Sequence, residues 1–244
     1  APSTPLMRHY TRWTLRVAAA LHADCRRDVR LAGEWGFGAG KPTLVVPGSG
    51  GVRTTLFYPP ARGLEEPVVV NPRGVRAYVR NDVFFRAIPR VLEEFPQARF
   101  LCADMADSPH ARRWVEKEGV ASAVELLPHL SSSQMAELYR RARVLVSPSV
   151  HDGTPNSLLE GMACGCLPVA GDLESLREWI VPGENGLLVD PTDPQALAEA
   201  MRRALRDDAL YRRAREHNVA LIRRRAEYDR CMEQAEAFYR RLLA

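Results

Sequence analysis

The residues best suited to chemistry stand close together, between His151 and Gly165. Two carboxylates, Asp152 and Glu160, lie eight positions apart, and Asn156 shares a helix face with Glu160 because four positions separate them. The free N–H groups at the start of that helix form a natural site for an anion. The pattern therefore places an anion site beside two acidic side chains. An ordinary capped helix of the core is the alternative, since a strand, a turn and a helix follow one another in many α/β domains.

The segments around this stretch predict the elements that must position it. Residues 143–149 form a short apolar run typical of a buried strand, and Asp152 with Gly153 gives a turn signal. Thr154 is expected to cap a helix, with the following proline at the first helical position, where its missing N–H costs nothing. Gly165 is expected to end that helix, whose apolar face should pack on the sheet.

The pair Asp152 and Glu160, with these surroundings, resembles the E-x7-E motif of the retaining nucleotide-sugar glycosyltransferases of family 4, which have the GT-B fold. The segments that follow the motif in the order of that family are Cys166–Asp172, Glu174, Gly183–Asp190 and Pro194–Ala198. The resemblance implies a donor-binding domain for transfer of a sugar from a UDP-, GDP- or other nucleoside-diphosphate sugar to an acceptor hydroxyl, with no further cofactor. One residue departs from the family, because Asp152 replaces the first glutamate and reaches less far toward the donor sugar.

An arginine-rich loop follows a predicted strand earlier in the chain. Arg73 and Arg80 match two basic residues of the family that bind the donor diphosphate, and Arg76 is available as a substitute. Cations fixed beside the leaving diphosphate stabilise the transition state more than the ground state, because charge develops as the glycosidic bond breaks. The resemblance thus implies catalytic roles for Arg73, Arg80 and Asp152, without a metal. A solvated basic loop is the alternative.

The resemblance also implies which residues bind the rest of the donor. Glu160 is expected to accept hydrogen bonds from the two ribose hydroxyls. The His129 side chain is expected to pack or cap, while its backbone borders the base. Asp104 replaces a glycine-rich turn of the family and receives no role. The full set expected to bind the donor is Glu160, Gly153, Thr154, Asn156, His129 and Leu130.

Composition argues against several other classes of protein. The 244 residues are 46% hydrophobic and 26% charged, an ordinary globular balance, and the net charge of +4 permits acidic substrates without demanding nucleic acid. Apolar runs stay well short of the roughly 20 residues of a transmembrane segment, and the start of the sequence lacks a signal-peptide pattern. Five cysteines, an odd number without metal-ligand spacing, indicate a reducing compartment and hence a cytoplasmic protein.

The order of elements predicts an α/β fold. From residue 68 to 206, apolar strands alternate with helices, so we expect a Rossmann-like parallel sheet with helices on both faces, as one half of a GT-B fold. Ligands of such sheets bind beyond the carboxyl ends of the strands, where the loops 71–80 and 152–155 fall. Three parts are expected: 1–43, a remnant of the acceptor-side half with a linker; 44–222, the donor-binding domain; and 223–244, a C-terminal crossover helix.

The N-terminal region predicts smaller elements. Residues 1–7 are rich in proline, serine and threonine and are expected to be disordered or extended. Helices are expected over 10–20 and 24–35, followed by a strand at 43–46. The glycines of 47–52 fit either a hinge beside a ligand or a flexible connector.

Three functions are compatible with the sequence. The first is a glycosyltransferase donor domain, whose partners are a nucleotide-sugar, an unknown acceptor and a missing acceptor domain in cis or in trans. The second is a non-catalytic module that binds a nucleotide-sugar. The third is a nucleotide-sugar epimerase or hydrolase of similar fold. A dinucleotide oxidoreductase is disfavoured, because no G-x-G-x-x-G follows a strand.

Overall fold

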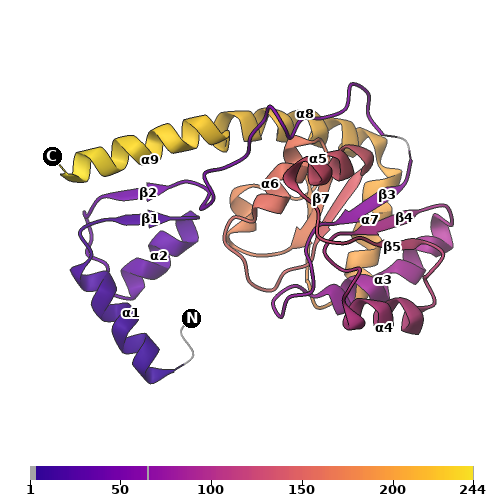
Figure 1. Ribbon diagram of the computed structural model, residues 1–244, viewed down its shortest axis with the longest axis horizontal. Helices are drawn as coiled ribbons and strands as arrows, with labels where there is room; N and C mark the ends of the chain where they lie inside the picture. The colour runs from indigo at the N-terminus through magenta and orange to yellow at the C-terminus, as the bar shows by residue number, and fades with distance from the viewer. Residues whose placement is uncertain (1–3, 65, 244) are drawn as a thin grey trace.

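The computed structural model describes residues 4–64 and 66–243, which form a small and a large lobe (Figure 1). Among these residues, the large lobe holds a parallel sheet of six strands in the order β5-β4-β3-β6-β7-β8, with helices on both faces. The predicted α/β fold class is therefore confirmed. The strands are β3 (Val68–Asn71), β4 (Arg99–Cys102), β5 (Val124–Leu126), β6 (Val144–Ser147), β7 (Leu167–Gly171) and β8 (Leu187–Val189). The helices are α3 (Asn81–Glu94), α4 (Pro109–Glu118), α5 (Ser132–Arg141), α6 (Asn156–Ala163), the 3-10 turn η1 (Leu176–Glu178), α7 (Pro194–Arg206) and α8 (Asp208–Arg225).

The strands are buried because helices cover both faces of the sheet. On β3, Val69 packs into a core with α3, α4 and α7, whereas Val68 and Val70 pack into a second core with α5 and α6. This alternation follows from the pleat of a strand, which points successive side chains to opposite faces. The central strands are therefore apolar along most of their length, and polar side chains collect at their ends.

The strand order reverses between β3 and β6, which makes this the topological switch point of the sheet. These strands are neighbours, with Val69 opposite Val144 and Val70 opposite Leu145, although β4 and β5 come between them in the chain. The connections beyond their carboxyl ends lead to opposite sides, which is the usual position of a ligand in such sheets. The polypeptide between β3 and α3 and that between β6 and α6 border this position.

The small lobe is built from both ends of the chain. Its elements are α1 (Pro5–Val17), β1 (Leu21–Ala23), α2 (Arg26–Glu34) and β2 (Thr43–Val45). Strands β1 and β2 pair in parallel, and helix α9 (Tyr228–Leu243) runs along them as a continuation of α8 (Figure 1). A hydrogen bond of 3.0 Å joins the Tyr239 hydroxyl of α9 to the His22 ring. The domain boundary expected at residue 44 thus falls inside a strand of the small lobe.

Two features of the small lobe differ from the sequence-based expectations. Helix α1 begins at Pro5, because the Thr4 side chain accepts a hydrogen bond from the Met7 N–H. Residues 5–7 are therefore helical and not extended, while residues 1–3 lie outside the described range. Strand β1 is not among the expected elements, because its three residues are too few to show a period.

The cysteines of the chain are packing groups. All five, each within the described ranges, are buried free thiols. Burial raises the pKa of Cys25 and that of Cys164 to about 12, so these thiols stay protonated near neutral pH. Within 4–64 and 66–243, no helix combines the length and the apolar character needed to span a membrane.

Candidate functional site

A cavity of about 340 Å³ lies at the carboxyl edge of the sheet, beside the point where β3 and β6 diverge. Its lining comes from the loops after β3, β4 and β5 and from one side of α5 and α6. Its size is that of a small-molecule site, which typically measures roughly 300–1,000 Å³. Of the residues expected to bind a donor, Arg73, Asn156, His129, Leu130 and Glu160 line it together.

A buried pair of asparagines shapes the loop that carries Arg73. The side chain of Asn71, at the end of β3, donates to Asn81 Oδ1 at 2.8 Å and accepts from the Arg73 N–H at 3.0 Å. Asn81, at the start of α3, donates in turn to the Gly74 carbonyl at 3.2 Å. These side-chain amides form the hydrogen bonds that water would otherwise form with the backbone of this buried loop. They thereby hold the backbone of Arg73 in place. Sequence reasoning missed this role, which is recognisable only once the two asparagines are known to be adjacent.

Arg73 is the buried cation of the site. It is 9% exposed, its guanidinium lies 5.6 Å from the Tyr78 ring, and its Nη2 lies 2.9 Å from Asp152 Oδ2. The approach to Asp152 is close, but its orientation leaves Oδ2 without a hydrogen bond from any described residue. The ion pair therefore joins the two loops on either side of the switch point. Asp152 itself is not among the residues that line the cavity.

Glu160 is a partly buried carboxylate in the lining of the cavity. It lies one turn after Asn156 on α6, and its burial raises its pKa to about 6. The Tyr139 hydroxyl of α5 donates a long hydrogen bond of 3.5 Å to it. Asn156 Oδ1 is also buried and has no hydrogen-bond partner among the described residues. Two oxygen acceptors on one face of α6 are thus incompletely satisfied, which is typical of a binding site.

Asp104 occupies the rim of the cavity, although the sequence assigned it no role. Its backbone is left-handed, with a φ of 58°, a conformation that aspartate tolerates better than most residues. Its carboxylate lies 3.6 Å from His129 Nδ1 and 4.0 Å from Arg76. The expectation that the His129 side chain packs or caps is not met, because this side chain is 86% exposed.

Arg80 lies outside this cavity, unlike Arg76. Its guanidinium forms two hydrogen bonds of 2.8 Å with Asp82, two positions along at the start of α3. That local ion pair engages the Arg80 guanidinium and raises its pKa. The expected arrangement of Arg73 and Arg80 around one cleft is therefore not the one observed, and Arg76 is the second arginine beside the cavity.

Gly153 and Thr154 also lie outside the cavity. The predicted cap at Thr154 is not formed, because α6 begins at Asn156 after Pro155, with no side-chain cap. Thr154 is buried, and both its N–H and its hydroxyl donate to Asp24 of the small lobe. The loop between Asp152 and α6 is consequently held from the small lobe and not by the start of its own helix.

The lining of the cavity therefore combines groups of opposite charge. Arg73 and Arg76 offer cations to a phosphate, and guanidinium groups suit phosphate oxygens well. Glu160 and Asn156 offer acceptors to hydroxyl groups. Leu130 and Met135 contribute apolar surface between the polar groups. The arrangement suits a ligand with both phosphates and vicinal hydroxyls.

Comparison with known proteins places the chain in a family. The model of the family described as Glycosyl transferases group 1 matches residues 67–207, which is more than half of the chain. The chain belongs to this family and carries a glycosyltransferase domain. The match covers the large lobe from β3 to the end of α7, including Arg73 and Glu160.

Individual relatives are longer than this chain. The exopolysaccharide phosphotransferase of Streptomyces coelicolor is 34% identical over 159 residues, which cover 64% of this chain and 17% of that protein. The alpha-maltose-1-phosphate synthase of Mycolicibacterium smegmatis is 29% identical over 209 residues, or 75% of this chain and 51% of that protein. The chain thus spans about half or less of the length of these relatives.

A solved structure shows the same fold. HepE of Anabaena, in complex with UDP and glucose, matches with a TM-score of 0.82 at 15% sequence identity. The match covers 96% of this chain and 67% of that one, so it includes both lobes. The fold of the chain is therefore that of a GT-B glycosyltransferase.

Proposed function

We propose that this chain is the donor-binding domain of a retaining, metal-independent glycosyltransferase of family 4. The observation that carries the proposal is the presence, in one cavity, of the buried cation Arg73 and the largely buried carboxylate Glu160. A nucleoside-diphosphate sugar presents a diphosphate and two vicinal ribose hydroxyls, which these two ends complement.

The ribose is assigned to Glu160 and Asn156. An ionised Glu160 accepts hydrogen bonds from both ribose hydroxyls, which replace the water that burial removes from the carboxylate. The unsatisfied Oδ1 of Asn156 offers a further acceptor one turn earlier. The complex of HepE with UDP and glucose supports a uridine nucleotide in this position, because the two proteins share a fold.

The diphosphate is assigned to Arg73 and Arg76. When the bond from the anomeric carbon to the phosphate oxygen breaks, its electron pair remains on the diphosphate. Cations held in place before the reaction stabilise this charge without reorganising, which lowers the barrier. These arginines would stabilise the charge of the leaving diphosphate, as a metal ion does in other enzymes. Asp152, beside Arg73, is assigned to a hydroxyl of the donor sugar.

Transfer further requires an acceptor-binding half, in cis or in trans. The acceptor hydroxyl forms the new bond on the face of the sugar that the diphosphate leaves, and its proton passes to the oxygen of the departing diphosphate. Much of the rate of such a reaction comes from holding the two reactants together. The greater length of the relatives supports a second half. The free thiols support a reducing compartment such as the cytoplasm.

A thermal-shift panel of UDP-, GDP-, ADP- and TDP-sugars, with and without a chelator, tests the donor assignment. One nucleotide class should stabilise the chain by about 2.7 kcal/mol at ~100 times its dissociation constant, with the chelator making no difference. Absence of binding by all four classes would refute the assignment. Binding that disappears with chelator would refute metal independence alone.

The chain on its own should hydrolyse or transfer little sugar, even where it binds the donor. The measurement is product formation with a simple acceptor alcohol, before and after addition of an acceptor-binding half taken from a relative. Robust transfer by the chain alone would contradict the need for a second half.

A further inference from the structure

Asp24 forms a bridge between the small lobe and the loop that carries Asp152. It follows β1 directly and is half-buried. One oxygen of its carboxylate accepts a hydrogen bond of 2.8 Å from the Thr154 N–H, and the other accepts one of 2.6 Å from the Gly48 N–H. Its carbonyl accepts a third, of 2.8 Å, from the Thr154 hydroxyl. One residue thus ties together the end of β1, the connector between the lobes and the loop before α6.

The loop is shaped to receive this carboxylate. A Cβ added at Gly153 would overlap the Asp24 side chain, and one added at Gly48 would lie 3.2 Å from its Oδ1. Both glycines therefore let the backbone approach the carboxylate more closely than another residue would. The Thr154 hydroxyl also accepts from Trp179 Nε1 at 3.3 Å, which leaves Thr154 fully occupied by structural contacts.

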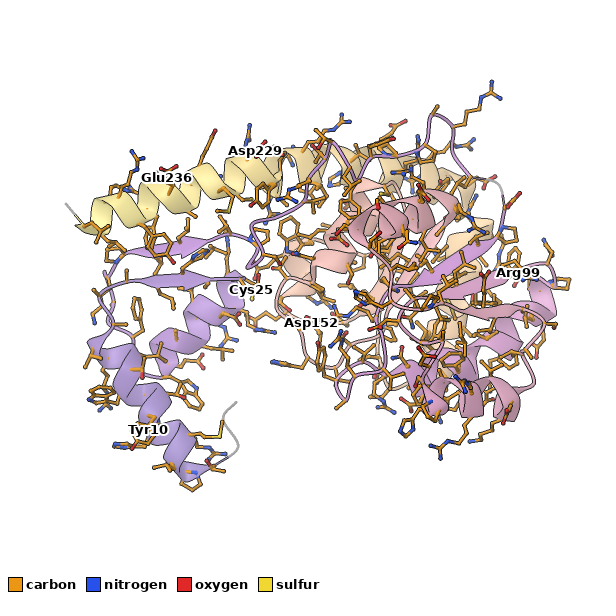
Figure 2. The ribbon with its side chains drawn as sticks, viewed as in Figure 1. Tyr10, Cys25, Arg99, Asp152, Asp229 and Glu236 are labelled. Carbon is orange, nitrogen blue, oxygen red and sulfur yellow. The ribbon has the colours of Figure 1, made fainter. Side chains whose placement is uncertain are left out.

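Helix α2 holds the same loop at a second point. Arg27 donates to the Asp152 carbonyl at 2.5 Å, and the Ser175 hydroxyl donates to that carbonyl at 2.7 Å. Asp28 steadies the Arg27 guanidinium with an ion pair of 2.7 Å. The peptide groups on both sides of Gly153 are therefore fixed by the small lobe. Figure 2 shows Asp152 on the side of the large lobe that faces Cys25, the residue next to Asp24.

We infer that Asp24 is a positioning residue for the sugar end of the donor site. The inference rests on the proposed function, in which Asp152 contacts the donor sugar while Arg73 and Glu160 hold the nucleotide. By fixing the Thr154 N–H, Asp24 sets where the Asp152 carboxylate lies. Loss of this contact should therefore weaken the hold on the sugar and spare the nucleotide, since the nucleotide groups belong to the large lobe alone.

The test compares two ligands that differ only in the sugar. UDP and UDP-glucose, or GDP and GDP-mannose if the first pair does not bind, are titrated calorimetrically into the full chain and its Asp24→Asn and Asp24→Ala variants. Affinity for the free diphosphate should change by less than about twofold. Affinity for the nucleotide-sugar should fall by about tenfold in Asp24→Ala, in line with the loss of a charged hydrogen bond.

Arg30→Ala is the matched control for lobe docking. Arg30 joins the lobes through a two-point ion pair with Glu174, at 2.6 and 3.0 Å, and does not touch the 152–154 loop. The control should leave the ratio of the two affinities unchanged. An equal change in this ratio for Arg30→Ala and Asp24→Ala would overturn the inference. It would mean that any contact between the lobes has the same effect and that Asp24 has no specific role.

Hydrogen exchange at the Thr154 amide provides a second readout. This amide should be protected in the parent chain and exchange faster in Asp24→Ala, which removes the acceptor. Asp24→Asn, which keeps the volume of the side chain and one of its two acceptor oxygens, should show a smaller increase and serves if Asp24→Ala does not fold. If the parent chain binds nucleotide but the variants show unchanged protection or an unchanged affinity ratio, the inference about Asp24 is refuted. The proposed function then still stands. If the parent chain binds no nucleotide, the proposed function fails and this inference with it.

Discussion

Replacing Glu160 by glutamine should lower nucleotide affinity and raise the free energy of unfolding in the same molecule. Under the proposed function the carboxylate accepts hydrogen bonds from two ribose hydroxyls, which the neutral amide, with one acceptor oxygen, serves poorly. A hydrogen bond to a charged group contributes roughly 1.5–3 kcal/mol, so UDP affinity should fall by about ten- to a hundredfold. Without ligand, however, the carboxylate is a largely buried charge with one long hydrogen bond from Tyr139.

The gain in stability follows from the pKa of Glu160. Burial raises this pKa from 4.5 to about 6, which means that folding disfavours the ionised form. Below pH 4.5 the carboxyl is protonated in the folded and the unfolded chain, and its contribution to stability is fully present. As the pH rises through 6, that contribution is lost. Each pKa unit corresponds to about 1.4 kcal/mol, so Glu160→Gln should be more stable than the parent chain by about 2 kcal/mol at pH 8.

Urea titrations at pH 5 and pH 8, with calorimetry of UDP binding at pH 8, measure both effects. Glu137→Gln is the control, because Glu137 is exposed on the neighbouring helix α5. The difference in stability between Glu160→Gln and the parent chain should grow from pH 5 to pH 8, whereas the control should show little change. A Glu160→Gln variant that is less stable than the parent at pH 8, or that binds UDP equally well, would refute the reasoning.

Three further outcomes are expected. UDP affinity of the parent chain should fall as the pH drops below about 6, because Glu160 then becomes protonated, and calorimetry from pH 5 to 8 checks this. Arg73→Ala should weaken UDP binding by at least tenfold, whereas Arg80→Ala should change it little, because Arg80 is engaged with Asp82; equal losses would contradict the observed geometry. Gly161→Ala should destabilise the fold by about 1–3 kcal/mol in urea titrations, because an added Cβ overlaps Leu145 in the core, and an unchanged midpoint would contradict this.

The sequence allowed the large lobe to be predicted because its signals are local. Each strand from β3 to β8 is an apolar run, and each helix between them shows its own period, so the parallel sheet follows from their order. The position of the site follows in turn, because Arg73 and Asp152 lie in loops at the carboxyl edge. The start of α1 was missed, although Thr4 and Pro5 form an ordinary cap and first position.

The contacts that the sequence could not predict are those between distant residues. Thr154 carries the local signal of a helix cap, but Asp24, 130 positions earlier, accepts hydrogen bonds from its N–H and its hydroxyl and overrides that signal. Arg80 matches a basic position of the family, yet a neighbouring aspartate decides where its side chain points. In both cases the residue type predicted a polar contact correctly, but the partner in that contact could not be predicted from the sequence.

The construction of the site from two lobes explains why its ends should respond differently to change. Arg73 and Glu160 belong to the large lobe, where the sheet and its two cores hold the loops in place. The backbone beside Asp152 is instead held by Asp24 and Arg27 of the small lobe. A shift of the small lobe should therefore move the backbone beside Asp152 more than the loops that carry Arg73 and Glu160. Under the proposed function, affinity for the nucleotide should come from one lobe alone, whereas affinity for the sugar should depend on the docking of both.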